Sequence, residues 1–312
     1  MRLLVINYHY LRYKNKKFLA SSGVGDKIFR DQLIELKKYY TPINFSEYKK
    51  ISSSKKQDDD RYVIVTFDDG LKDCLTKVIP IAKKLKFPIT FFAPGLPLEK
   101  QKVLTIQKIH LLLEKEKVES LAKNFYQGLK KLKKPIKRNK LKNLGIKGVY
   151  RYDTGLIRKF KLDLNYLLPY DVRDKIINKI FKRYYPDEKR LARQLYLSIH
   201  DLKKILKSGF EIGGHSYTHS MLSRLTPRKQ EEEIEKNRKI LDKITSESLP
   251  FSIPFGHIGT FNNTTKRLLK KYNFFNLVTT ERKLNIDNYN QYDISRFDVN
   301  DVFSGSKLKK VL

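Results

Sequence analysis

The pattern of apolar and polar positions along the chain predicts strands that are followed by helices. Short apolar runs have the length of strands, and the stretches after them space their apolar residues as a helix does. In the first part of the chain we predict strands at 2–8, 62–67 and 89–93 and helices at 26–40 and 71–85. Repeated strand–helix units favour a parallel sheet, closed as a barrel or open.

The alternation stops after Gly95, where helix candidates continue and strand candidates are scarce. These candidates lie at 106–121, 125–132, 169–185 and 188–195. We therefore predict a mainly helical insertion or lid at 96–198, between the two parts of a barrel domain at 1–95 and 199–312. Its polar segment 130–143 is expected to be a loop or poorly ordered.

Alternation returns in the last third of the chain. We predict helices at 199–207, 227–244 and 263–272 and strands at 210–212, 251–254, 275–279 and 292–297. Gly209 is expected to end the first of these helices, and Thr226-Pro227 to begin the second. The fold class is therefore α/β.

Composition fits one large domain with an insertion, because 312 residues, 40% of them hydrophobic, can bury a sizeable core. The apolar runs are far shorter than the roughly 20 residues of a membrane span. The first residues are too soon polar for a signal peptide. We expect a cytoplasmic protein, and the single cysteine, Cys74, excludes an internal disulfide.

The net charge of +33 could attract nucleic acid, anionic lipid or an acidic glycan. Lysines are scattered through nearly every predicted helix and form no single stripe with interleaved aromatic residues, so nucleic acid is not the expected partner. Two interpretations remain. The lysines are either ordinary solvated residues or a means of peripheral contact with an anionic membrane surface.

Two carboxylates, Asp68 and Asp69, follow a predicted strand and precede a helix, at the edge where α/β folds place their chemistry. In an extended backbone they cannot both face the same way. One could bind a cation while the other takes a proton from water that the cation polarises. The alternative is that they only cap the helix that follows.

Two histidines, His215 and His219, follow another short strand and are four residues apart. On a helical turn this spacing places both rings on one side, a common way to hold zinc or a similar divalent ion. One aspartate and two histidines would give three ligands and leave positions open for water and substrate, as catalytic metal sites do.

Three motifs in this order resemble those of the polysaccharide deacetylases of the NodB-like kind, also called carbohydrate esterase family four. They are TFDDG at Thr66–Gly70, HSYTH at His215–His219 and PFG at Pro254–Gly256. The resemblance implies a distorted, incomplete (β/α) barrel of about seven strands. It also implies hydrolysis of an acetamide at a divalent metal, commonly zinc.

The resemblance implies that Asp68 is the general base and that Asp69, His215 and His219 bind the metal. Pro254, Phe255 and Gly256 would lie at the substrate and its oxyanion, with a backbone N–H near Phe255 as donor.

The sequence departs from the family pattern at the residue that supports the base. Commoner members carry an arginine two positions before the proline of the third motif, where this chain has Ser252. Arg296 is a candidate substitute, although it could equally be an exposed structural arginine.

The expected late histidine acid is also missing, because no histidine follows His257. A circularly permuted subset of the family takes this acid from a Tyr-His pair at the end of the first strand, and Tyr8-His9 is similar to it. We expect His9 to be the general acid, against the alternative that it only packs at the barrel mouth. His257 is the second choice, and His110 and His200 have weaker cases.

We therefore expect a carbohydrate N-deacetylase that acts on an N-acetylhexosamine-containing glycan or glycan precursor. A second interpretation keeps the site and changes the acyl group, for instance to that of an N-formyl sugar. A third is a catalytically inactive basic protein that binds nucleic acid or anionic lipid.

Overall fold

The computed structural model describes residues 1–11, 23–53, 60–133, 149–150, 153, 155–286 and 293–309. The chain divides into two compact units. As far as the described residues go, unit 1 lies within Met1–Gln101 and Ala192–Leu312, and unit 2 within Lys102–Leu191. No described helix is long and apolar enough to cross a bilayer.

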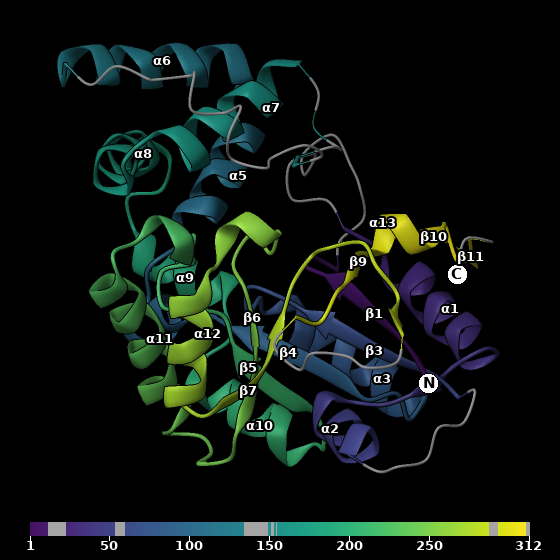
Figure 1. The fold of residues 1–312 in the computed structure, drawn as a ribbon. Coiled ribbons are helices and arrows are strands. Elements are labelled where there is room, and N and C mark those ends of the chain that lie inside the picture. Colours follow the sequence, from purple (N-terminus) through teal and green to yellow (C-terminus); the bar gives the residue numbers. More distant parts are fainter. Residues whose placement is uncertain are drawn as a thin grey trace. The chain divides into compact units, whose positions relative to one another are not determined.

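Unit 1 is built on one curled, largely parallel sheet (Figure 1). Its strands are β1 (Arg2–Tyr8), β2 (Thr41–Pro42), β3 (Arg61–Phe67), β4 (Ile89–Ala93), β5 (Glu211–Gly214), β6 (Leu249–Ser252), β7 (Phe274–Val278), β8 (Asn285–Ile286) and β9 (Phe297–Asp298). The order is β7-β6-β5-β4-β3-β1-β8, with β2 beside β3 and β9 beside β1. Among these pairs only β1 and β8 run antiparallel.

Helices surround this sheet. They are α1 (Asp26–Lys37), α2 (Phe45–Ser53), the π-turn η1 (Cys74–Val78), α3 (Ile79–Lys84), α4 (Gly95–Lys100), α10 (Ile199–Lys207), α11 (Pro227–Leu241), α12 (Asn263–Lys271) and α13 (Val299–Val302), with short 3-10 turns η4 (Leu222–Arg224) and η5 (Ile258–Thr260). A separate hairpin joins β10 (Phe303–Ser304) to β11 (Lys307–Leu308).

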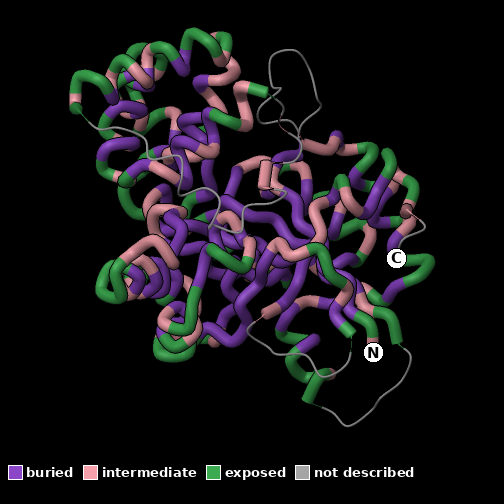
Figure 2. The backbone as a smooth tube through the Cα atoms, turned by 45° about the horizontal axis from the view of Figure 1, so that its top comes forward, coloured by how far each residue is buried: buried purple, intermediate pink, exposed green. Residues whose placement is uncertain are grey.

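The two faces of the sheet bury two different cores, because side chains alternate along a strand. On the outer face, residues such as Ile6, Val65 and Phe91 pack against α1, α3, α10, α11 and α12. On the inner face, Val5 and Phe92 join Phe45 and Tyr48 of α2 in a smaller core. Strands β4, β5, β6 and β7 are buried along their whole length, and buried residues, purple in Figure 2, fill the middle of unit 1.

Alternation also decides which polar residues reach the inner face. Asn7 pairs in register with Thr66, and each lies between outward-facing apolar neighbours. Both are buried. Asp68, which directly follows β3, takes the next inward-facing position after Thr66. The side chains of Asn7, Thr66 and Asp68 therefore converge at the carboxyl ends of β1 and β3.

Unit 2 is helical. It contains α5 (Thr105–Lys115), α6 (Val118–Lys131), α7 (Gly155–Leu162), the π-turn η3 (Asp163–Leu167), α8 (Tyr170–Tyr184) and the first half of α9 (Glu188–Leu195). It has a buried interior of its own, with Leu112, Phe125, Phe160 and Phe181 among its members.

The predicted helix 71–85 is wrong at its beginning. Leu71 forms an isolated antiparallel bridge with Tyr196, and Lys72 donates its backbone N–H to Leu195. Strand-like pairing of these two residues delays the helix to Cys74, where it opens as a π-turn.

The boundary between the predicted helices 106–121 and 125–132 is also wrong. α5 ends at Lys115 and α6 begins at Val118, with Lys117 extended between them. Apolar residues continue on both sides of the break with helical spacing, so periodicity alone could not locate it. Of the polar segment 130–143, residues 134–143 lie outside the described part.

The predicted strand 292–297 is not continuous, and Tyr292 lies outside the described residues. Ile294 forms an isolated parallel bridge with Val278, and β9 begins only at Phe297. Between them, the Asn285 side chain bonds both the N–H and the carbonyl of Ser295, which replaces the pairing of a strand.

Candidate active site

The predicted site residues gather at the carboxyl ends of β3 and β5. Asp68 and Asp69 directly follow β3, and His215 directly follows β5. Parallel strands bring their carboxyl ends to one edge of the sheet, which is where α/β folds place ligands. The side chains of Asp68, Asp69 and His215 are all buried.

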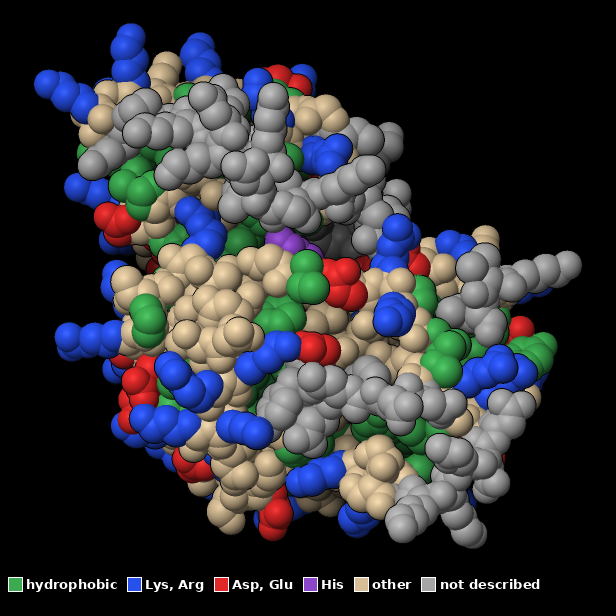
Figure 3. Space-filling model, in the orientation of Figure 1, with side chains coloured by type: hydrophobic (Ala, Val, Ile, Leu, Met, Phe, Trp, Pro, Cys, Tyr) green, Lys and Arg blue, Asp and Glu red, His purple; other side chains and the backbone are tan. Residues whose placement is uncertain are grey.

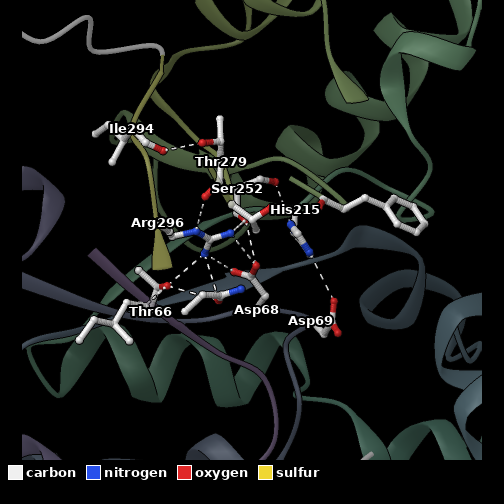
Figure 4. Close-up of polar contacts among 12 residues, drawn as sticks. Thr66, Asp68, Asp69, His215, Ser252, Thr279, Ile294 and Arg296 are labelled. Atoms are coloured by element: carbon white, nitrogen blue, oxygen red, sulfur yellow. Dashed lines mark hydrogen bonds and ion pairs between the residues drawn. The ribbon is translucent and has the colours of Figure 1, made fainter. Parts of the chain in front are cut away.

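Arg296 lies against Asp68 and holds both of its carboxylate oxygens (Figure 4). Nη1 donates to Oδ1 at 2.9 Å and Nη2 donates to Oδ2 at 2.8 Å. The guanidinium is fully buried, so the alternative of an exposed structural arginine is wrong. Such a two-point pair fixes the orientation of the carboxylate as well as its charge.

Every N–H direction of Arg296 finds an acceptor. Nε donates to the Thr279 carbonyl at 2.9 Å, Nη2 to Ser252 Oγ at 2.8 Å, and Nη1 to Thr66 Oγ1 at 3.0 Å and Asn7 Oδ1 at 3.2 Å. Ser252 in turn donates to Asp68 Oδ2 at 3.1 Å. A buried guanidinium is tolerated only when its donors are satisfied in this way.

The charge of Arg296 keeps Asp68 ionised. Burial alone would raise the pKa of Asp68, but the Arg296 guanidinium, with smaller contributions from His215 and His9, lowers it below its ordinary value. Asp68 is therefore a carboxylate at neutral pH and can accept a proton.

Asp69 turns away from the line of β3. Its φ of 71° and the φ of 62° at Gly70 are left-handed, so the chain turns sharply there and Asp69 faces the histidines while Asp68 faces Arg296. The helix-cap alternative is wrong, because the helix starts only at Cys74, preceded by Asp73.

His215 and His219 meet without a helical turn, which corrects the expected reason for their proximity. Residues 215–219 form an irregular loop, in which Ser216 and His219 have φ of 56° and 61°. The two ring centroids are nevertheless 4.8 Å apart. Nε2 of each ring lies 3.4 Å from Asp69 Oδ1.

This group fits a divalent metal ion. Ligand atoms of Asp69, His215 and His219 lie within 4.8 Å of one another. His215 Nδ1 bonds the Ser252 carbonyl at 2.8 Å, which leaves Nε2 to face Asp69; this atom is buried and makes no hydrogen bond within the described part of the chain. Two imidazoles and one carboxylate are a donor set that zinc prefers, and a carbonyl that fixes the ring is typical of zinc ligands.

The protonation of the two rings differs. Burial lowers the pKa of His219 to about 4, so this ring is neutral at neutral pH and has a lone pair to donate. Burial also opposes a charge on His215, but Asp68 and Asp69 outweigh it and raise its pKa. The pKa of Asp69 lies well below its ordinary value, since His215 and His219 outweigh its burial.

The third motif lies beside His219. The Phe255 ring packs 5.0 Å from the His219 ring, between ring centroids. Phe255 and Gly256 both have left-handed φ, and a Cβ on Gly256 would come within 2.4 Å of Thr280. Pro254, which precedes them, is buried.

His9 follows β1 and is half-buried. Its charge contributes to the lowered pKa of Asp68 and of Asp69, so it lies within electrostatic reach of the site. His257 caps η5 instead, where its Nδ1 accepts the N–H of Gly259. His110 lies in α5 of unit 2, and His200 is exposed on α10.

The sequence model of the family described as polysaccharide deacetylase matches residues 55–124 and 187–276, together just over half of the chain. The chain belongs to the polysaccharide deacetylase family. The deacetylase is thus a hydrolase of the class that removes N-acetyl groups from carbohydrates, and the resemblance seen in its motifs is confirmed. No curated protein sequence gives a significant match.

Solved structures share the fold of the deacetylase. The Streptococcus pyogenes deacetylase PplD in complex with acetate is 15% identical, with a TM-score of 0.59 over 96% of this chain and 92% of that chain. IcaB from Ammonifex degensii is 15% identical, with a TM-score of 0.56 over 96% and 91%. A de-N-acetylase from Aggregatibacter actinomycetemcomitans is 12% identical, with a TM-score of 0.57 over 96% and 95%. The predicted incomplete (β/α) barrel is confirmed.

Sequence reasoning missed two residues that complete the Arg296 network, Asn7 and Thr66. A signal for them exists, because each is a polar residue at an inward position of a strand that is otherwise apolar. A buried polar residue needs a partner, and here the partner is the guanidinium.

Proposed function

We propose that the deacetylase hydrolyses the N-acetyl group of an N-acetylhexosamine-containing glycan or glycan precursor at a divalent metal, most simply Zn²⁺. The observation that carries the proposal is the metal-compatible cluster of Asp69, His215 and His219 beside a carboxylate, Asp68, that Arg296 keeps ionised. Base and metal ligands of this kind are what hydrolysis of an unactivated amide requires.

Each residue has a separate role in this proposal. When bound, the metal would supply Lewis acidity toward the amide carbonyl and lower the pKa of water. Asp68 takes the proton from the attacking water. A backbone N–H near Phe255 donates to the developing oxyanion, with Pro254 and Gly256 shaping the turn. Arg296 orients Asp68.

His9 is proposed to protonate the leaving amine. It follows β1 next to β3, and it contributes to the electrostatics of both aspartates. His257 is less suited to donate the proton, because burial lowers its pKa and leaves its ring mostly neutral at neutral pH, and its Nδ1 already accepts a hydrogen bond at η5. The assignment thus follows position and charge together.

The proposed base is tested with Asp68→Asn. The purified protein with added Zn²⁺ or Co²⁺ is expected to release acetate from N-acetylglucosamine oligosaccharides or from a sugar nucleotide carrying the same group. Asp68→Asn should lower kcat by about 10²–10⁴-fold, since the amide cannot accept the proton. Asp171→Asn, on the exposed side of α8, is the matched control and should match the wild type. Full activity of Asp68→Asn would refute the mechanism.

The proposed acid is tested by comparing His9→Gln with His257→Gln. His9→Gln should lower kcat by about 10²–10⁴-fold and leave Co²⁺ binding unchanged, because it removes a proton donor and no ligand. His257→Gln should keep nearly full activity. The reverse order of the two variants would move the acid to His257.

A further inference from the structure

Helix α11 presents two polar residues to the loop that carries His215 and His219. Glu233 and Asn237 are four residues apart, so they lie one turn apart on the same helix face. Both bond backbone N–H groups of the loop 215–219. Neither residue belongs to the metal cluster or to the Arg296 network.

Two consecutive loop residues donate three hydrogen bonds to Glu233. The backbone N–H groups of Tyr217 and Thr218 donate to Oε2 at 3.0 and 2.8 Å. The Thr218 hydroxyl donates to Oε1 at 2.6 Å. Both carboxylate oxygens are therefore engaged by the short segment between the two histidines.

Asn237 joins the ends of two neighbouring strands and is fully buried. Its Oδ1 accepts the N–H of His215 at 3.0 Å, and its Nδ2 donates to the carbonyl of Ala93 at the end of β4, also at 3.0 Å. The approach is so close that a Cβ on Gly214 would come within 2.7 Å of Oδ1. This accounts for a glycine directly before the first histidine.

The loop needs such support because its backbone is strained. Ser216 and His219 have left-handed φ, which costs about 1–3 kcal/mol for each residue other than glycine. Ser216 Oγ accepts the N–H of His219 at 3.0 Å, and the N–H groups of Gly95 and Leu96 at the start of α4 donate to the carbonyls of Ser216 and Tyr217. Side chains of α11 thus bind N–H groups of the loop, and backbone N–H groups of α4 bind its carbonyls.

We propose that Glu233 and Asn237 are positioning residues, which hold the loop 215–219 with both histidine rings arranged for metal before the metal binds. The inference rests on the proposed function, because it takes His215 and His219 as ligands. It adds that the affinity for metal is set in part by a helix that contributes no ligand. Groups that orient metal ligands typically change affinity by about 10–100-fold when they are removed.

The test compares Glu233→Ala with Glu232→Ala by Co²⁺ titration of the full chain, followed in the visible absorption spectrum. Glu232 lies next to Glu233 but forms surface ion pairs with Arg228 and Lys236. Glu233→Ala is expected to bind Co²⁺ about 10–100-fold more weakly and with an altered spectrum. Glu232→Ala should match the wild type. Glu233→Gln, whose amide can still accept both N–H groups and bond Thr218, should recover most of the affinity.

Amide hydrogen exchange of the metal-free protein gives an independent readout. Exchange at Tyr217 and Thr218 should be faster in Glu233→Ala than in Glu232→Ala. If the wild type bound no Co²⁺, the proposed function would fail, and exchange alone would decide whether α11 orders the loop. Wild-type affinity and wild-type exchange in Glu233→Ala would overturn the inference.

A milder variant covers the case in which Glu233→Ala does not fold. Thr218→Val removes the hydroxyl bond to Glu233 and keeps both backbone bonds. It should weaken Co²⁺ binding by about three- to tenfold, the effect expected for the loss of one ordinary hydrogen bond. Unchanged affinity in this variant would count against the inference.

Discussion

Arg296 supports the proposed base from the far end of the chain. Commoner members of the family are expected to carry this arginine shortly before the third motif, and here Ser252 occupies that position. Ser252 remains in contact with both partners, since it accepts from Arg296 and donates to Asp68. The guanidinium therefore reaches the carboxylate from a different backbone position, and the serine hydroxyl bridges the two side chains.

Removal of Arg296 should change both stability and pH dependence. Burial on its own raises the pKa of Asp68 and Arg296 offsets this, so Arg296→Met should raise that pKa. A base with a higher pKa is protonated at higher pH, so the acid limb of kcat/KM should move to higher pH. The unpaired buried carboxylate should lower the free energy of unfolding at neutral pH by about 3–5 kcal/mol. Urea denaturation and acetate release at several pH values measure the two effects.

Two variants sharpen the Arg296 prediction. Arg296→Lys keeps the charge without the planar fork, so it should fall between wild type and Arg296→Met. Arg282→Met removes an exposed arginine that pairs with Asp301 and should change stability by less than about 1 kcal/mol. An unmoved acid limb in Arg296→Met would show that Arg296 does not tune Asp68.

At the scale of elements, the sequence predicts the strands and helices whose apolar residues follow a clear pattern. It fails where tertiary contacts set the bounds of an element. β1 and β4 begin and end as predicted, because their apolar runs are bounded by polar residues or Pro88. The start of the helix after Gly70 is set by pairing of Leu71 with Tyr196, a residue far along the chain. No local pattern contains that information.

The histidine loop shows the same limit more sharply. A spacing of four residues correctly brings His215 and His219 together, but for the wrong reason, since the loop is not helical. Its path depends on Glu233 and Asn237, which follow it by more than ten residues and look like ordinary polar positions of a helix. Motifs identify the reacting groups, whereas their orientation comes from residues without a motif.

For the whole molecule, the high positive charge is spread over the surface. Lysine and arginine side chains are spread over the face shown in Figure 3, among apolar and acidic side chains, and do not form a single patch. The two ion pairs in which Lys271 and Lys239 take part lie on helices of unit 1. The charge of +33 therefore does not by itself identify a substrate or a partner.

Binding of metal should stabilise the whole protein through unit 1. Among the described residues the only cluster with metal-ligand geometry is Asp69, His215 and His219. A ligand that binds the folded state alone adds about 2.7 kcal/mol at a free concentration 100-fold above its Kd. Zn²⁺ should therefore raise the unfolding temperature of the wild type in a concentration-dependent way, and the increase should be lost with a chelator.

The control for this prediction is His219→Ala, which removes one ligand and keeps the charge of Asp69. It should show little or no rise with Zn²⁺, whereas His200→Ala, on the exposed side of α10, should respond like the wild type. Because Asp68 and Asp69 raise the pKa of His215, the rise with Zn²⁺ should weaken below about pH 6, where protons compete for that ring even though His219, with a pKa of about 4, stays neutral. An equal rise in His219→Ala would place the bound zinc elsewhere in the chain.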